Sequence, residues 1–128
     1  MRQQEKTELV DRILAGTNSK KLKGVDLKGV DLSNTTLWGV DLQGASLDGA
    51  DLQGADLQGA CLRAVCLLRA NLQGSDLRGT DLRRADIRGA NLRRANLQGS
   101  DLRGAYLQGA DLSEANLLGA DVAGTLLA

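Results

Sequence analysis

Leucine recurs at every fifth residue along most of this 128-residue chain. From Leu22 to Leu127 the register never slips, and only Ile87 and Val122 replace leucine at these centre positions. The position two residues before a centre holds Ala, Ser, Thr or Val in 21 of 22 units, with Lys20 the exception. The position directly before the centre is Asp or Asn in 15 of 22 units. A period of five fits neither a helix nor an ordinary strand. Each unit therefore needs a short extended piece and a bend, and we expect the chain to coil.

Glycine occupies 15 of the 21 positions that lie two residues after a centre. The third residue of a type II turn needs a positive φ, which glycine adopts without steric cost. The sequence therefore predicts a type II turn in each of these units. Because a side chain is strained at positive φ, we predict a different turn geometry where another residue replaces glycine. These six exceptions are Asn34, Ala64, Arg69, Arg84, Arg94 and Glu114.

The centre and the small position before it are the only consistently apolar slots, so they should point inward. The chain has no Phe and one Trp, so aromatic packing cannot fill a core. Stacked leucines would instead form a continuous apolar spine, in which each buried leucine contributes roughly 1.5 to 3 kcal/mol. The spine residues that we single out are Leu57, Leu62, Leu72, Leu77, Leu92 and Leu97.

Units such as Ala55-Asp56-Leu57-Gln58-Gly59 resemble the pentapeptide-repeat family, whose motif is A(D/N)LxG or A(D/N)Lxx. The resemblance spans about residues 20–128. It implies an all-β fold, a right-handed quadrilateral β-helix (β-solenoid) with four units per coil and about five coils. Periodicity by itself leaves the coil size open, because coils of 15 and of 20 residues both produce columns made only of glycine.

The N-terminal segment, residues 1–18, has a different pattern from the repeat in residues 19–128. Leu9, Val10, Ile13 and Leu14 form one stripe, and Gly16 is placed as a helix stop. We expect an amphipathic helix that caps the open end of the solenoid, so that both parts make one structural domain. The alternative is a membrane-surface or partner helix, which the mixed charges disfavour. With no apolar run of signal-peptide or membrane-helix length, we expect a cytoplasmic protein without a membrane partner.

The last units carry apolar residues at outward positions, namely Tyr106, Leu118 and Leu126. We hypothesise that these residues form a self-association patch through which two molecules meet as a homodimer, since two-fold contacts are the commonest oligomers. The alternative is that the last residues, Leu126 to Ala128, fold over and plug the spine.

Sixteen basic and sixteen acidic residues cancel, but their distribution is uneven. Residues 63–103 hold nine Arg and four Asp, whereas residues 26–62 hold six Asp and one Lys. This division could orient an anionic partner against the middle coils. The alternative is a solvated, Asp-paired surface. Nucleic acid is not an expected partner, because aromatic residues for base stacking are almost absent. The candidate anionic-partner surface, which would girdle one coil, consists of Arg83, Arg84, Arg88, Arg93 and Arg94.

Residues suited to catalysis are missing from the pattern. The chain has no His, no nucleophile beside a base and no nucleotide-binding glycine motif. Eleven of the thirteen carboxylates in the repeat directly precede a centre, so we predict that they accept local backbone hydrogen bonds. Cys61 and Cys66 are too few for a disulfide framework and lack a His partner for zinc. We expect no enzyme activity, no cofactor and no metal, and two half-buried thiols in a reducing compartment.

The function that we expect is a non-enzymatic structural or protein-interaction module with a protein partner yet to be found. The resemblance implies one alternative, because some relatives mimic B-form DNA and act on type II topoisomerases such as gyrase. Zero net charge and Arg-rich middle coils disfavour that alternative.

Overall fold

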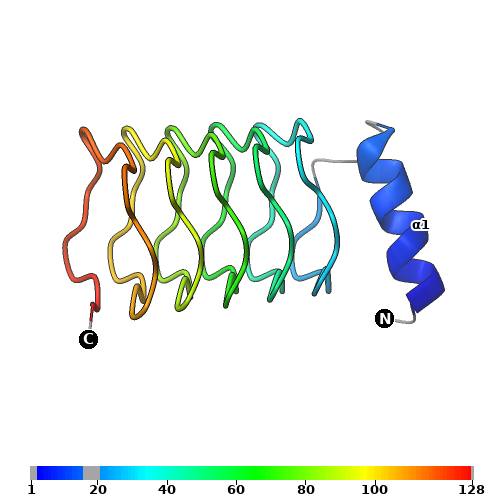
Figure 1. The fold of residues 1–128 in the computed structure, drawn as a ribbon. Helices are drawn as coiled ribbons and strands as arrows, with labels where there is room; N and C mark the ends of the chain where they lie inside the picture. The colour runs from blue at the N-terminus through cyan, green and yellow to red at the C-terminus, as the bar shows by residue number, and fades with distance from the viewer. Residues whose placement is uncertain (1–2, 16–20, 128) are drawn as a thin grey trace.

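A computed structural model describes residues 3–15 and 21–127. One helix, α1 (Gln3–Leu14), stands at one end of a stack of coils, and the last described coil lies at the other end (Figure 1). The coils pair through isolated parallel β-bridges, one in each five-residue unit, rather than through long strands. Each bridge joins residues twenty positions apart, as in Asp41 with Cys61 and Cys61 with Asp81. Four units therefore complete one coil, and the fold is a right-handed quadrilateral β-helix.

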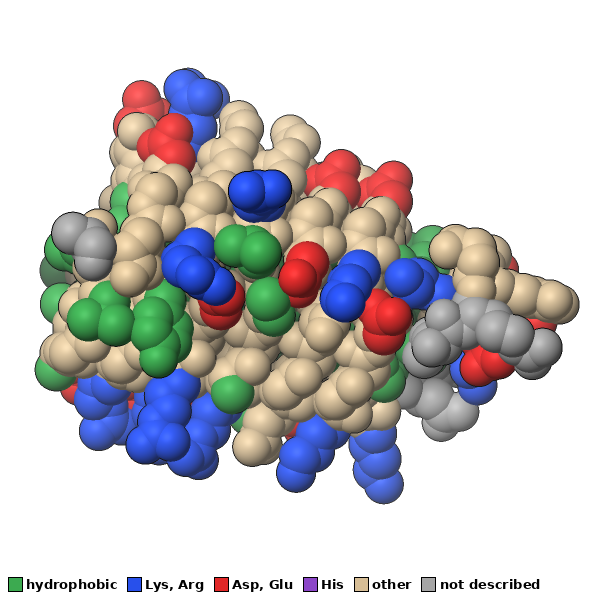
Figure 2. All heavy atoms as spheres, turned by 90° about the horizontal axis from the view of Figure 1, so that it is seen from below, with side chains coloured by type: hydrophobic (Ala, Val, Ile, Leu, Met, Phe, Trp, Pro, Cys, Tyr) green, Lys and Arg blue, Asp and Glu red, His purple; other side chains and the backbone are tan. Residues whose placement is uncertain are grey.

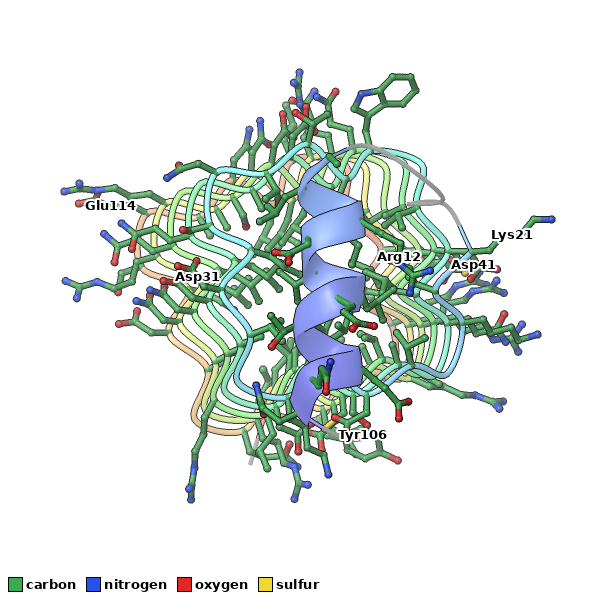
Figure 3. All side chains as sticks on the ribbon, turned by 90° about the vertical axis from the view of Figure 1, so that its right-hand side faces the viewer. Arg12, Lys21, Asp31, Asp41, Tyr106 and Glu114 are labelled. Atoms are coloured by element: carbon green, nitrogen blue, oxygen red, sulfur yellow. The ribbon has the colours of Figure 1, made fainter. Side chains whose placement is uncertain are left out.

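We number the four faces of the solenoid by the centres that they carry. Face 1 carries the centres from Leu22 to Val122 at steps of twenty, face 2 those from Leu27 to Leu127, face 3 those from Leu32 to Leu112, and face 4 those from Leu37 to Leu117. Figure 3 looks along the axis and shows Asp31 and Glu114 of face 3 on the side opposite to Lys21 and Asp41 of face 1. Residues that are far apart in the sequence therefore share a face whenever their numbers differ by twenty.

Backbone hydrogen bonds explain why each unit bends and stacks. In the unit around Leu57, the N–H of Ala60 donates to the carbonyl of Leu57 at 3.0 Å and closes the turn. The N–H groups of Leu57 and Gly59 donate to the next coil, at 2.8 and 2.9 Å. The same pattern recurs along the repeat, so nearly every inner backbone group is paired.

The core is the column of inward-facing centres and small residues. Each of the six spine leucines singled out above is at most 1% exposed. Ala55 and Ala50 are fully covered, which places the small position where the walls approach each other. Trp38, the single tryptophan, is 57% exposed and contributes nothing to this interior. The solenoid thus buries aliphatic surface in a thin, continuous stack.

The six bends without glycine have the same geometry as the glycine bends, so our prediction of a different turn there is wrong. Their φ angles lie between 55 and 61°, close to the 64 to 73° of the glycines. The inter-coil ladder explains this result. The N–H of Arg84 donates to the carbonyl of Arg103 at 3.0 Å, just as Gly59 donates to Arg78 at 2.9 Å. A different turn would break these hydrogen bonds and the stacking of the coils beyond them. Losing them would cost more than the left-handed strain, which is about 1–2 kcal/mol for each residue.

Helix α1 lies across the first coil (Figure 3). Ile13 is buried, and Leu9 and Val10 pack partly against the core. Leu14, which the stripe also included, is 55% exposed and does not join them. Lys6 fastens the helix to face 2, because its Nζ donates to the carbonyl of Lys28 at 3.2 Å. The expected helix stop at Gly16 and the expected boundary between residues 18 and 19 lie outside the described residues.

Helix α1 is far too short and too polar to cross a bilayer, and the residues described offer no other helix that would.

Candidate functional site

The carboxylates of the repeat serve the backbone, as we predicted. In all eleven units with Asp before the centre, its Oδ1 accepts a hydrogen bond from the N–H two residues later, at 3.0 to 3.2 Å. Asn71, Asn91, Asn96 and Asn116 make the same bond with their amide oxygen. These side chains therefore fix the start of each turn.

Four of these aspartates also hold an arginine two residues later in a bidentate pair. In the unit around Leu102, Arg103 Nη2 donates to Asp101 Oδ2 at 2.6 Å and Arg103 Nε donates to Asp101 Oδ1 at 2.9 Å. This pairing lowers the pKa of Asp101 to about 2. Arg83 pairs in the same way with Asp81, where the contact between Nη2 and Oδ2 is 2.7 Å. An arginine in such a fork already has a carboxylate partner.

The arginines proposed as a girdle do not form one surface. Arg83 and Arg84 lie on face 1, Arg88 on face 2, and Arg93 and Arg94 on face 3. Four of them meet a carboxylate: the closest distances are 2.7 Å for Arg83, 2.8 Å for Arg88, 3.6 Å for Arg93 and 2.8 Å for Arg94. The girdle is therefore largely neutralised. Of its five members, only Arg84 makes no ion pair within the described part of the chain.

Face 1 gathers a different set of arginines, which we call the face-1 ridge: Arg63, Arg83, Arg84 and Arg103. Together with Gly104 they line a hollow of about 310 Å³. Three of them occur twenty residues apart, so they stack in one column at about 4.8 Å per coil. Figure 2 shows Lys and Arg side chains gathered along its lower edge, in the C-terminal half of the molecule. Sequence reasoning missed Arg63 and Arg103, because it grouped arginines along one coil, whereas this column runs across successive coils.

The C-terminal coil exposes apolar side chains that earlier coils bury. Leu117, Val122 and Leu127 occupy inward-facing centre positions, yet they are 37%, 48% and 67% exposed because no described residue stacks on them. Tyr106 and Leu126 pair directly through a β-bridge on face 2. We call these five residues the C-terminal apolar end.

Of the three residues proposed for self-association, the structure brings together two. Tyr106 and Leu126 are neighbours, whereas Leu118 lies on face 4, on the other side of the solenoid. Leu126 continues the ladder, since its N–H donates to the carbonyl of Ala105 at 2.9 Å and its own carbonyl accepts from Leu107 at 2.7 Å. Neither Leu126 nor Leu127 plugs the spine, so that alternative is wrong for both; Ala128 lies outside the described residues.

The two cysteines are free and half-buried, on faces 1 and 2 of the same coil. Burial raises the pKa of the Cys66 thiol, which keeps it protonated and disfavours reactivity. Across residues 3–15 and 21–127, no three His, Cys, Asp or Glu side chains come together as metal ligands.

A model of the family described as pentapeptide repeats matches the chain in 8 copies, over residues 26–63, 66–104 and 90–127. A solved pentapeptide-repeat protein from the cyanobacterium Cyanothece 51142 is 26% identical and has a TM-score of 0.89; the match covers 95% of this chain and 99% of that one. Another, from Nostoc PCC 7120, is 32% identical, with 86% and 93% covered and a TM-score of 0.70. HetL, from the same cyanobacterium and involved in heterocyst differentiation regulation, is 25% identical, with 83% and 73% covered and a TM-score of 0.59. No curated protein matches this chain at a significant level.

Proposed function

Because this chain belongs to the pentapeptide-repeat family, we propose that it is a non-enzymatic protein-interaction module that pairs with a second copy of itself through its C-terminal apolar end. The observation that carries the proposal is the contrast between the two ends of the solenoid. Helix α1 covers the first coil, whereas five large apolar side chains stand 37 to 67% exposed at the last. Exposed apolar patches of this kind mark protein contacts or aggregation sites.

A second copy fits this end better than an unrelated partner does. A two-fold axis across the end would place the apolar side chains of one molecule against the same side chains of the other. The backbone adds complementarity. In earlier coils the N–H of each centre donates to the following coil, as Leu92 does to Asp111 at 2.8 Å, and the carbonyl of each small residue accepts from it, as Thr80 does from Asp101 at 2.9 Å. The last coil therefore presents both N–H and carbonyl groups along an open edge, and a second copy of that edge can pair with them. Pairing with another solenoid edge satisfies groups that water alone would otherwise bind.

The four side faces of the solenoid are the surfaces available to partners other than a second copy. They are columns of side chains on the hydrogen-bonded ladder, where four arginines are already paired with aspartates. Two free thiols suit a reducing compartment, which supports a cytoplasmic location. Gyrase inhibition by DNA mimicry finds no support in the charges, because face 1 of the middle coils is basic where a mimic should be acidic.

Sedimentation equilibrium over a wide concentration range tests the pairing. Leu126→Asp is a sharp variant, because Asp26 and Asp86 occupy the same slot on face 2 and the repeat tolerates Asp there. We expect the wild type to dimerise and Leu126→Asp to remain a monomer with unchanged circular dichroism. The matched control is Leu14→Asp, an exposed leucine at the opposite end, which should still dimerise. A wild-type monomer at the highest concentration would refute the pairing.

A further inference from the structure

We propose that the face-1 ridge is a binding site for a phosphomonoester dianion, presented as a phosphorylated side chain of a partner protein. The ridge lies on a side face, away from the C-terminal apolar end. This inference rests on one part of the proposed function, namely that the partner is a protein. It does not depend on whether two copies of the chain pair.

Unpaired positive charge is the first argument. Within the ridge, Arg83 and Arg103 hold Asp81 and Asp101, and Arg103 also lies 3.7 Å from Asp121. Arg63 and Arg84 make no ion pair with any residue in 3–15 or 21–127. The ridge therefore offers two guanidinium groups that no described carboxylate contacts, and its four arginines exceed the three neighbouring aspartates by one charge.

Cys61 explains why Arg63 lacks a partner. In the next two coils of this column, Asp81 and Asp101 precede their arginines by two residues and form the forks described above. Cys61 holds the corresponding slot, as its β-bridge to Asp81 shows, and a thiol supplies no carboxylate. Arg63 therefore has the same placement as Arg83 but keeps its donors for another ligand.

Arg84 is directed to the same hollow by its strained bend. Its φ is 60°, and its Cγ would lie 3.6 Å from a Cβ built on Gly104, so its stem crosses the neighbouring bend. A separation of 3.6 Å is an ordinary van der Waals contact, so the stem lies over this bend without crowding it. Arg84 is exposed and lines the same hollow as Arg63.

A phosphomonoester matches this arrangement better than the other common anions do. It carries a charge of about −1.5 to −2 at pH 7 and three acceptor oxygens, which suits two uncommitted guanidinium groups. A single carboxylate carries half that charge and would satisfy one of them. A nucleic-acid strand needs a long basic track and gains from aromatic stacking, whereas three stacked arginines span only about 10 Å and no aromatic residue lines the hollow.

The experiment titrates the full chain with a phosphoserine peptide that has neutral flanking residues. The other probes are its unphosphorylated form, inorganic phosphate, and single- and double-stranded oligonucleotides. Calorimetry measures affinity, and arginine Nε–H resonances report which side chains respond. We expect saturable binding of the phosphopeptide with shifts at Arg63 and Arg84, and none with the unphosphorylated peptide.

Two variants remove the uncommitted charges without harming the fold. Arg84→Gly installs the residue that this bend prefers, and Cys61→Asp builds the missing fork for Arg63. Each should weaken phosphopeptide binding by about tenfold or more, the effect of losing one charge-assisted contact. Arg69→Gly is the matched control on face 2, with the same charge change at a φ of 58°. Cys61→Asn is the uncharged control for Cys61→Asp. Both controls should bind as the wild type does.

Several results would overturn the proposal. One is the absence of saturable phosphopeptide binding, and another is an equal loss of affinity in Arg69→Gly and Arg84→Gly. Inorganic phosphate binding as tightly as the phosphopeptide would assign the site to a free ion instead of a protein. Tighter binding of an oligonucleotide would assign it to nucleic acid. The oligomeric state of Arg84→Gly keeps the two proposals apart. If this variant loses phosphopeptide binding but still dimerises, the phosphate site and the self-association surface are independent.

Discussion

Exchanging glycine and alanine at two neighbouring bends measures the free-energy cost of holding a residue with a side chain at positive φ. Ala64 is held at a φ of 55°, and Gly59, one unit earlier on the adjoining face, at 65°. A Cβ built on Gly59 meets no atom within 4 Å, so side-chain crowding contributes nothing there. We expect Ala64→Gly to stabilise the protein and Gly59→Ala to destabilise it.

The size of the effect follows from two opposing contributions. The left-handed conformation costs a residue with a Cβ about 1–2 kcal/mol. Glycine loses more backbone entropy on folding, which opposes the gain by about 0.5–1 kcal/mol. The difference, about 0.5–1 kcal/mol in the free energy of unfolding, should appear with opposite sign in the two variants. Both bends keep their inter-coil bonds, at 2.9 Å for each donor N–H, so hydrogen bonding should cancel in the comparison.

Urea unfolding followed by far-ultraviolet circular dichroism measures both free energies, and the double variant checks that they add. At Gly54 the comparison is less clean, because a Cβ there would force the Oδ1 at the end of the Asn34 side chain to move aside. Gly59, where a Cβ meets nothing, is therefore the better site for the exchange. If Ala64→Gly lowers the stability, or if Ala64→Gly and Gly59→Ala change it in the same direction, then the six bends without glycine are not strained and the reasoning fails.

Further predictions concern the core, the buried hydroxyls and the aspartates. Leu77→Ala should cost about 2–5 kcal/mol in urea unfolding, because its cavity lies in the middle of the spine; a cost below 1 kcal/mol would contradict the spine. Ser75→Ala and Ser100→Ala should each raise the melting temperature, because these hydroxyls are buried without a hydrogen-bond partner and such a group costs about 1–3 kcal/mol; a lower melting temperature would show that they are bonded. The pKa of Asp101 is about 2 in the folded chain, below its ordinary 3.8, so its contribution to stability should be complete above pH 4 and disappear as the pH falls through 2. Asp101→Asn should flatten that decline, and an unchanged pH profile would refute the role of the fork. A gyrase supercoiling assay should show no inhibition by this protein.

Much of this architecture could be predicted from the sequence because its causes are local. The five-residue period places each Leu inward, and the Asp before it binds an N–H two residues away, as in Asp51 and Gln53. The helix over residues 3–14 was predictable from its stripe, although Leu14 shows that a stripe cannot specify which of its members reach the core. The four-sided shape came from the resemblance to a family, because the spacing of glycines allowed coils of either 15 or 20 residues.

The tertiary structure decided whatever depends on contacts between coils. The twenty-residue offset joins Arg63 to Arg83 and Arg103, and it separates Arg88 and Arg93 from them, so the basic surface differs from the one that local sequence suggested. The ladder imposes positive φ at bends where the residue itself would avoid it, because stacking energy is shared over the whole coil while strain is confined to one residue. The five-residue pattern is enough to tell which side chains face inward and where the chain turns, because both depend on neighbouring residues. Which outward side chains meet depends on the stacking of coils, because residues twenty positions apart lie side by side.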